Sequence, residues 1–213
     1  MAPKFHDLTV IDIHPESSDS VAVSFGVPAG LQKDFAFTPG QYLTLRHTIG
    51  GQDIRRSYSI SSALGADQLT VGVRRVDDGV FSSYVNGTLK VGDSLQVMTP
   101  EGRFTAKTGA AARVLLLAAG SGITPMMSIA ASTLAAHPKA EVTLVYGNRS
   151  TDTVMFRAAL DQLKDRYMGR FTLIHILSRE EQDVPLLNGR VDGAKVTALA
   201  HVGAIDPNGM DAV

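Results

Sequence analysis

The sequence RVLLLAAGSGITP at residues 113–125 joins an unbroken apolar run directly to a glycine-rich turn. The apolar run is typical of a strand buried on both faces of a parallel sheet. Gly120 and Gly122 allow a ligand to approach the backbone closely, Thr124 can cap a following helix, and Pro125 suits the first helical turn. Because a helix N-terminus offers unpaired N–H groups and a partial positive charge, the stretch predicts a pyrophosphate site. An ordinary strand-to-helix turn is the alternative, since neither GxGxxG nor a P-loop is present.

Strands and helices alternate downstream of this stretch. We expect, in order, a helix over 124–136, a strand over 141–146, a helix containing Met155, Phe156, Ala159, Leu160 and Leu163, a strand over 171–177 and a helix over 194–200. Such alternation implies a parallel sheet with right-handed crossovers. We therefore expect a Rossmann-like α/β domain over residues 109–213, with its ligands at the carboxyl ends of the strands.

The first 108 residues consist of short alternating runs broken by turn residues. The expected strands are 8–14, 21–27, 41–48, 53–60, 69–74 and 94–99. One helix is expected at 81–86, with Gly87 as its end signal. Many short strands at this spacing predict an antiparallel barrel or sandwich over residues 1–108, with a linker within 100–112.

Composition excludes several classes of function. The chain has 213 residues, 20 basic and 21 acidic, so no basic excess favours nucleic-acid binding. It contains no cysteine, which excludes disulfides, thiol nucleophiles and iron–sulfur clusters within it. Its histidines are dispersed, so no metal site is expected. The longest apolar run is far shorter than the roughly 20 residues that span a bilayer, and no secretion signal is found. We expect a cytoplasmic protein without a membrane partner.

The segment RRSYSISS at residues 55–62 gathers groups that suit a phosphorylated aromatic ligand. Alternation places Arg56 and Tyr58 on one face of a strand and Ser57 and Ser59 on the other. Arginine binds phosphate in a bidentate manner, and tyrosine can pack flat on a conjugated ring. By itself the segment fits a solvent-facing strand with an ordinary basic pair better than a binding site.

The segment DDGVFS at residues 77–82 is a turn that leads into a short helix. Gly79 and Ser82 can offer N–H groups and a hydroxyl to a second phosphate, although simple helix capping is the alternative.

RRSYSIS, GVFS and GSGITP occur in this order, the first two in the barrel-like half and the third opening the α/β half. The arrangement resembles the ferredoxin–NADP reductase superfamily, and TPEGRF, AAGSGITPMMSI and LVYGNRS are similar to the reductase components of phenylacetyl-CoA oxygenase (epoxidase) systems. The resemblance covers nearly the whole chain. It implies a Greek-key FAD-binding barrel, an NAD(P)-binding domain and hydride transfer from NADPH or NADH to FAD. It also implies an oxygenase component or a ferredoxin-type protein as the electron acceptor.

The resemblance implies two sets of cofactor-binding residues. Those for FAD are Arg56, Ser57, Tyr58, Ser59, Val73, Arg74, Gly79, Val80, Phe81 and Ser82. Those for the nicotinamide nucleotide are Gly120, Gly122, Thr124, Pro125, Arg149, Ser178 and Arg179. Ser59, near flavin N5, and Thr124, near the contact of the two rings, would be the catalytic pair.

The choice between NADPH and NADH depends on the ends of two strands. An acid there favours NADH and an arginine favours NADPH. Arg149 follows one strand, and Ser178 and Arg179 follow the next, which predicts a preference for NADPH. The neighbouring acids Glu180 and Glu181 weaken this prediction, and two solvated arginines are the alternative.

The chain also departs from the resemblance. In the family, the α/β domain continues to a Cys-Gly-Pro motif, and the oxygenase reductases carry a cysteine-rich ferredoxin domain after it. We therefore expect a fragment with a complete flavin site and an incomplete nicotinamide site, and a flavin-binding module without turnover is the alternative function. A short-chain dehydrogenase is disfavoured because Tyr167 lacks the expected downstream lysine. A hydrolase is disfavoured because no GxSxG motif occurs.

Overall fold

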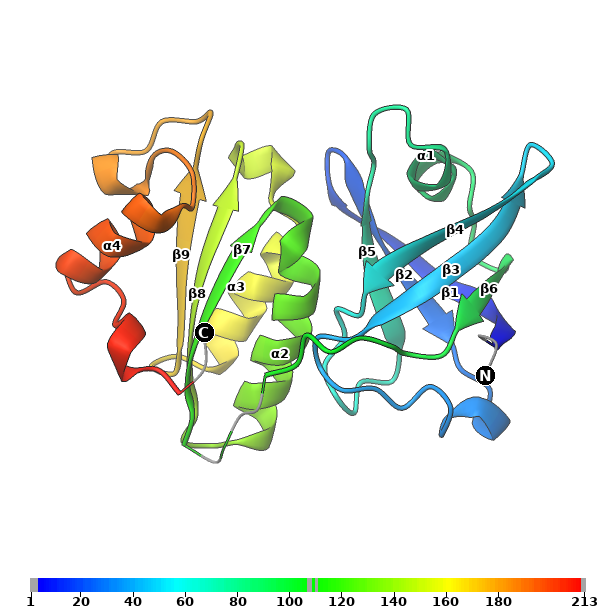
Figure 1. The fold of residues 1–213 in the computed structure, drawn as a ribbon, viewed down its shortest axis with the longest axis horizontal. Coiled ribbons are helices and arrows are strands. Elements are labelled where there is room, and N and C mark those ends of the chain that lie inside the picture. Colours follow the sequence, from blue (N-terminus) through cyan, green and yellow to red (C-terminus); the bar gives the residue numbers. More distant parts are fainter. Residues whose placement is uncertain (1–3, 107–108, 110, 212–213) are drawn as a thin grey trace.

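The computed structural model describes residues 4–106, 109 and 111–211. Figure 1 shows two halves side by side, an antiparallel sheet wrapped into a barrel and a parallel sheet with helices on both faces. Helix α2 lies between the parallel sheet and the barrel. The expected order of a β half followed by an α/β half is confirmed.

The barrel half contains six antiparallel strands and one helix. They are β1 (Phe5–Ser17), β2 (Ser20–Gly26), β3 (Tyr42–Ile49), β4 (Gln52–Ser59), β5 (Leu69–Arg74), α1 (Val80–Gly87) and β6 (Ser94–Met98). The strand order β4-β3-β6-β1-β2-β5 places strands distant in sequence beside one another. Ile60 pairs with Val71, which joins the end of β4 to β5 and closes the sheet there. Alternate strand residues, such as Leu43 and Leu45, are fully buried in one core.

The α/β half contains three parallel strands in the order β7-β8-β9. Its elements are β7 (Arg113–Ala119), α2 (Ile123–Ala136), β8 (Glu141–Asn148), α3 (Arg157–Arg166), β9 (Phe171–Leu177) and α4 (Gly193–His201). Short 3₁₀ turns occupy Gly120–Gly122, Thr151–Thr153, Pro185–Leu187 and Pro207–Gly209, and one more, Ala29–Leu31, lies in the barrel half. Helices α2 and α3 cover one face of the sheet and α4 covers the other (Figure 1), so the sheet has a core on each side.

Two local expectations are wrong. The helix expected to include Met155 and Phe156 begins only at Arg157, after Phe156 adopts a left-handed backbone with φ of 58°. Both side chains are nevertheless buried in the core beside α3, which explains their apolar spacing. Thr124 does not cap α2: the helix begins one residue earlier, and the Thr124 hydroxyl donates to the Ser121 carbonyl oxygen at 2.9 Å.

The two halves are joined through α2. The Ser128 hydroxyl donates to the Ser62 carbonyl oxygen at 2.7 Å, and the Leu64 N–H donates to the Ser132 hydroxyl at 2.9 Å. Ala22 of the barrel also packs into the core of the α/β half. These contacts hold the carboxyl ends of β7 and β8 beside β5. Across the described part of the chain, no helix combines the length and apolarity that crossing a bilayer requires.

Candidate functional site

A cleft of about 550 Å³ lies between the two halves. It is lined by Asp19, Ser57, Tyr58, Ser59, Gly72, Arg74, Arg75, Val76, Asp77, Ser121, Gly122, Thr124, Pro125 and Arg149. The carboxyl ends of β7 and β8 and the β1–β2 hairpin lie on the same side of the molecule, at the top of Figure 1. The structure therefore brings the RSYS segment and the GSGITP segment to one site, although more than 60 positions separate them in the sequence.

The barrel side of the cleft is formed by the end of β4. Tyr58 is partly buried, and its ring lies 6.1 Å from that of Phe81, centroid to centroid. Burial raises the pKa of the Tyr58 phenol to about 12, and the nearby Arg56 charge opposes this only in part. Tyr58 is therefore a neutral hydrogen-bonding phenol at physiological pH. The Ser57 hydroxyl lies 3.0 Å from that of Thr44 on the neighbouring strand.

Arg56 lies beside the cleft rather than in its lining. It is exposed on β4, and its Nη1 donates to the Arg55 carbonyl oxygen at 2.7 Å. Its charge still acts on Tyr58, where it favours the ionised phenol. The guanidinium is thus close enough to act on a group in the cleft.

The segment predicted to hold a second phosphate is also outside the lining. The Ser82 hydroxyl donates to the Gly79 carbonyl oxygen and accepts the Val76 N–H, each at 3.1 Å, so it stabilises the start of α1. Phe81 is buried in the barrel core, and Val80 is exposed. The cleft is lined instead by the residues just before this segment.

Val73 is likewise buried in the barrel core. Its carbonyl oxygen accepts the Asn86 side-chain amide at 3.2 Å, and Val73 is not part of the cleft lining.

The α/β side of the cleft is the turn between β7 and α2. Gly120 has a φ of 53°, which favours glycine, and its carbonyl oxygen accepts the Tyr146 hydroxyl at 3.0 Å. No side chain caps α2, whereas Asp192 caps α4 by accepting the Lys195 N–H at 2.8 Å. The 3₁₀ turn itself accepts the Ile123 N–H at the Gly120 carbonyl oxygen, and the positive end of the α2 dipole lies at the cleft without a side-chain cap.

The residues of the cleft fit FAD and a dinucleotide. Arg74, Arg75 and Arg149 face it against the acids Asp19 and Asp77, so the local charge is positive, as phosphate binding requires. Hydroxyls and a neutral phenol stand beside these cations, which suits a flavin ring and its polar chain. No group of three or more histidine, cysteine, aspartate or glutamate side chains suited to a metal ion is found among the described residues.

Sequence reasoning missed six residues of the lining, namely Asp19, Gly72, Arg75, Val76, Asp77 and Ser121. Gly72 shows why the two halves meet closely here. A Cβ atom on Gly72 would lie 2.5 Å from Thr124 Cγ2 and 2.9 Å from Phe156 Cζ. The only available signal was a glycine inside a strand pattern, which often marks the close approach of another segment.

The predicted specificity residues are divided. Arg149 lines the cleft, while Ser178 and Arg179 do not. The Arg179 N–H donates to the Arg149 carbonyl oxygen at 2.7 Å, so the two backbones are adjacent. The Glu180 carboxylate accepts both the N–H and the hydroxyl of Thr151 at 2.6 Å. These hydrogen bonds lower the pKa of Glu180, which is therefore ionised and held by Thr151.

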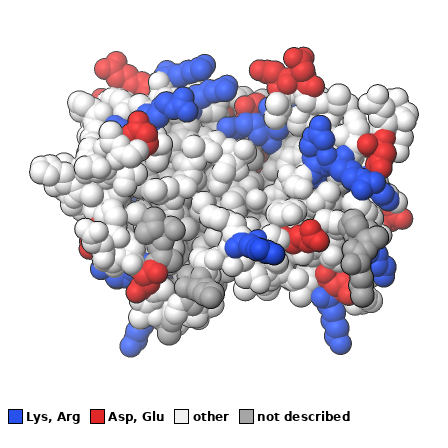
Figure 2. Space-filling model, in the orientation of Figure 1, with Lys and Arg blue, Asp and Glu red and all other residues white. Residues whose placement is uncertain are grey.

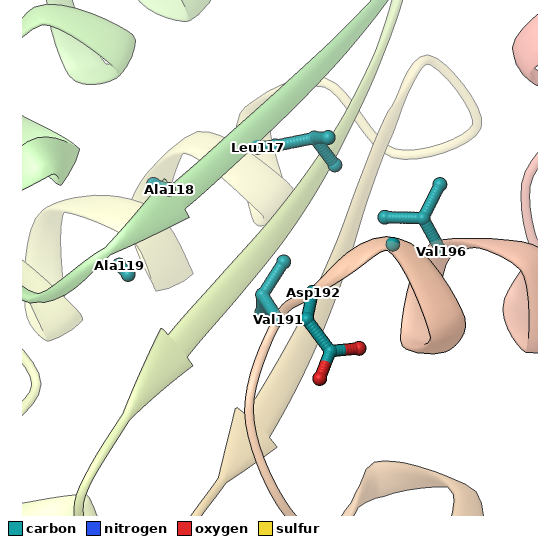
Figure 3. A pocket seen from close by; sticks show the side chains of 7 residues that line it. Leu117, Ala118, Ala119, Val191, Asp192 and Val196 are labelled. Atoms are coloured by element: carbon teal, nitrogen blue, oxygen red, sulfur yellow. The ribbon is translucent and has the colours of Figure 1, made fainter.

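A second pocket, of about 500 Å³, lies between β7 and the start of α4. Figure 3 shows Leu117 of β7 facing Val191 and Val196, with the Asp192 carboxylate at the rim. Asp192 is the one titratable residue of its lining, and none of the predicted site residues belongs to it.

Comparison with known families matches both halves. Residues 7–106 match the model described as the oxidoreductase FAD-binding domain, and residues 116–211 match that of the oxidoreductase NAD-binding domain. The two matches follow the order of the two halves and meet at the cleft.

The chain belongs to the ferredoxin–NADP reductase family of oxidoreductases. FAD and a nicotinamide dinucleotide are the cofactors of these domains.

Curated relatives in the ferredoxin–NADP reductase family include one of the subunits of the 1,2-phenylacetyl-CoA epoxidase of Escherichia coli. It is 43% identical over 197 residues, which are 92% of this chain and 55% of that protein. The ferredoxin reductase component of the 3-ketosteroid-9-alpha-monooxygenase of Mycolicibacterium smegmatis is 39% identical over 80% of this chain and 49% of its own length. The chain thus spans about half the length of these relatives.

Solved structures of the ferredoxin–NADP reductase type agree with the fold. The FAD/NAD-binding domain of a nitric oxide dioxygenase from Vibrio cholerae is 28% identical with a TM-score of 0.75, over 88% of this chain and 80% of that one. A ferredoxin NADP⁺ reductase from Neisseria gonorrhoeae, with bound FAD and NADP, has a TM-score of 0.77 at 20% identity, over 94% and 79% of the two chains.

Proposed function

We propose that this protein is an FAD-containing reductase that takes hydride from NADPH in preference to NADH and serves an oxygenase of the phenylacetyl-CoA epoxidase type. The single observation that carries the proposal is the shared cleft, in which Tyr58 and Ser59 of the barrel face Gly122 and Thr124 of the α/β half. Bound FAD would supply the redox chemistry, by accepting a hydride from the reduced nicotinamide. The chain itself supplies binding, orientation and charge.

Each side of the cleft has its own task in this proposal. The neutral Tyr58 phenol packs on the flavin ring, and Ser59 donates a hydrogen bond to its reactive edge. Arg56 would contact the FAD pyrophosphate. The strand backbone at Val73 and Arg74 would line the flavin tail, and the 79–82 segment would hold the second phosphate. Thr124 and Pro125 hold the nicotinamide end of the dinucleotide, and the start of α2 faces its pyrophosphate.

The proposed NADPH preference is supported by the state of Glu180. Its carboxylate is occupied by Thr151, so it is not directed at Arg149 or Arg179. Two guanidinium groups with adjacent backbones then remain for a 2′-phosphate, assisted by Ser178.

The proposed partner is an oxygenase component or a ferredoxin-type electron acceptor. This is supported by the names of the two curated relatives, which are oxygenase subunits or reductase components. On the face shown in Figure 2, acidic and basic side chains are interspersed, so no continuous basic surface favours nucleic acid there. We also propose a cytoplasmic location, where reduced nicotinamides are available, and a domain boundary after residue 108.

The decisive experiment is an absorbance spectrum of the purified protein followed by anaerobic addition of NADPH or NADH. A yellow protein that bleaches faster with NADPH at equal concentration supports the proposal. A yellow protein that stays oxidised supports a flavin-binding module without turnover. Equal or faster reduction by NADH would reject the preference.

The flavin site is tested by Arg56→Ala, with Arg55→Ala as the matched control. Arg55 is a neighbouring exposed arginine whose partner is Asp53, at 2.9 Å. Loss of a charge-assisted phosphate contact of about 1.5–3 kcal/mol predicts a roughly 10- to 100-fold weaker hold on FAD in Arg56→Ala. Equal FAD content in the two variants would remove Arg56 from the site.

A further inference from the structure

Arg74, at the end of β5, reaches from the barrel to the α/β half. Its Nη2 donates to the Thr153 carbonyl oxygen, beyond the end of β8. Its Nε lies 3.1 Å from Asp19 Oδ1 in the β1–β2 hairpin, as an ion pair without hydrogen-bond alignment. The side chains of Arg74 and Asp19 are only 21% and 26% exposed. One guanidinium thus joins the hairpin, β5 and the α/β half.

The same guanidinium lies against the glycine loop. A Cβ atom on Gly120 would fall 2.9 Å from Arg74 Nη1, so the cation is in close contact with that backbone. On its other side, Gly120 is held by the Tyr146 hydroxyl at 3.0 Å. The loop that opens α2 is therefore fixed between a barrel side chain and a side chain of its own sheet.

The β1–β2 hairpin forms two further hydrogen bonds to residues 152–156, in addition to the contacts of Arg74. The Ser18 N–H donates to the Asp152 carbonyl oxygen at 3.2 Å, and the Phe156 N–H donates to Glu16 Oε2 at 2.9 Å. The Asp19 carboxylate is itself oriented by the Ser17 hydroxyl at 2.9 Å. The hairpin and Arg74 together form one polar clamp across the halves.

We propose that Arg74 is a positioning residue, which fixes the Gly120–Gly122 loop relative to the barrel and so sets where a dinucleotide meets the flavin. It acts through Asp19 and Thr153 rather than as a phosphate ligand, because its charge is paired with Asp19 and its Nη2 donates to Thr153. Arg75 and Arg149 have no side-chain hydrogen bond or ion pair among the described residues and are the cations left for phosphates. The clamp stands on contacts alone, and its consequence for hydride transfer rests on the proposed function.

The clamp is tested by hydrogen exchange in Arg74→Gln, with Arg166→Gln, at an exposed arginine that ends α3, as the control. We expect amides in residues 119–124 and 151–156 to exchange roughly fivefold faster or more in Arg74→Gln. Amides of β3, which pairs with β4 and β6 rather than with β5, keep their rates, and Arg166→Gln matches the wild type in all three regions. Asp19→Asn gives a smaller change in the same direction. Unchanged exchange at 119–124 in both Arg74→Gln and Asp19→Asn would overturn the proposal.

The positioning role is tested by separating the rate of reduction from binding. In Arg74→Gln with full FAD content, we expect flavin reduction at saturating NADPH to slow about tenfold or more. The Kd for NADP⁺ stays within about twofold, because the nucleotide contacts remain on the α/β half. Arg74→Lys does not restore the rate, since an ammonium lacks the guanidinium fork.

Two other outcomes have separate meanings. A raised Kd with an unchanged rate makes Arg74 a direct nucleotide ligand and overturns the positioning role. A wild-type protein that NADPH does not reduce contradicts the proposed function. The exchange experiment still tests whether Arg74 and Asp19 hold the Gly120–Gly122 loop, because it does not depend on turnover.

Discussion

The barrel half and the α/β half build their parts of the cleft in different ways. The barrel buries one core inside a sheet that closes through Ile60 and Val71, and its cleft-lining groups lie at the edge where β4 meets β5. The α/β half buries a core on each face of its parallel sheet, and its cleft-lining groups follow the ends of the strands. In the barrel, the cleft depends on closure of the sheet. In the α/β half, it depends on the turn after one strand.

The largest losses of unfolding free energy should come from shortening one buried side chain in each half. These two variants test whether the halves unfold together. Leu45 of the barrel and Leu144 of the α/β half are each 0% exposed. We expect Leu45→Ala and Leu144→Ala each to lower the free energy of unfolding by about 2–5 kcal/mol in one cooperative transition, because α2 joins the halves. Calorimetry checks this, with Val91→Ala as an exposed control. Two transitions, each moved by only one variant, would show independent halves.

The next effect concerns the contact between the halves. In Gly72→Ala, the new methyl group overlaps Thr124 and Phe156, which predicts a loss of about 1–3 kcal/mol in unfolding free energy. Gly87→Ala is the matched control, because a Cβ atom there meets nothing within 4 Å and its backbone is helical. Urea denaturation should show the lower unfolding free energy in Gly72→Ala but not in Gly87→Ala. Adding Thr124→Ser to Gly72→Ala should restore part of the stability, because it removes the methyl group that the new Cβ atom meets. Equal stability of the two variants would mean that the halves do not pack closely at β5.

A smaller effect compares the buried phenols of the two halves under alkaline conditions. Burial raises the pKa of both Tyr58 and Tyr146 to about 12, from an ordinary value of 10. The unfolded chain therefore loses these protons first, so their contribution is intact below pH 10 and falls as pH rises toward 12. Tyr146→Phe should reduce the loss of unfolding free energy between pH 10 and pH 12 by up to about 2 kcal/mol, as measured by urea denaturation at each pH. Tyr58→Phe should flatten it less, because Tyr58 faces the open cleft. An unchanged slope in Tyr146→Phe would contradict the assignment.

The smallest effect tests the contrast between two helix starts. Asp192 caps α4 through the Lys195 N–H, whereas no side chain caps α2 at the cleft. Asp192→Ala should cost about 1 kcal/mol of unfolding free energy, and Asp192→Asn should retain most of it. Because α4 lies on the opposite face of the sheet from α2, flavin content should not change. Loss of flavin in Asp192→Ala would show that the two helix starts are coupled.

The sequence predicted the α/β half more fully than the cleft. The apolar run before Gly120 identified a buried strand, and the alternation after it identified the parallel sheet, because both signals are local. The same reasoning extended the third helix back over Met155 and Phe156, since apolar spacing reports burial but not backbone conformation. It also gave Thr124 a capping role that a tighter turn removes.

By itself, the sequence determined most of the strands and helices, and it singled out RSYS and GSGITP as candidate binding segments. Periodicity, glycine and charged groups act over a few residues, so these signals can be recognised without knowing the fold. Only the tertiary structure decided that Arg74 contacts Asp19 and Thr153, that Gly72 has no room for a side chain, and that Glu180 is held by Thr151. Those facts depend on contacts between residues distant in the chain, which packing determines and local pattern does not encode.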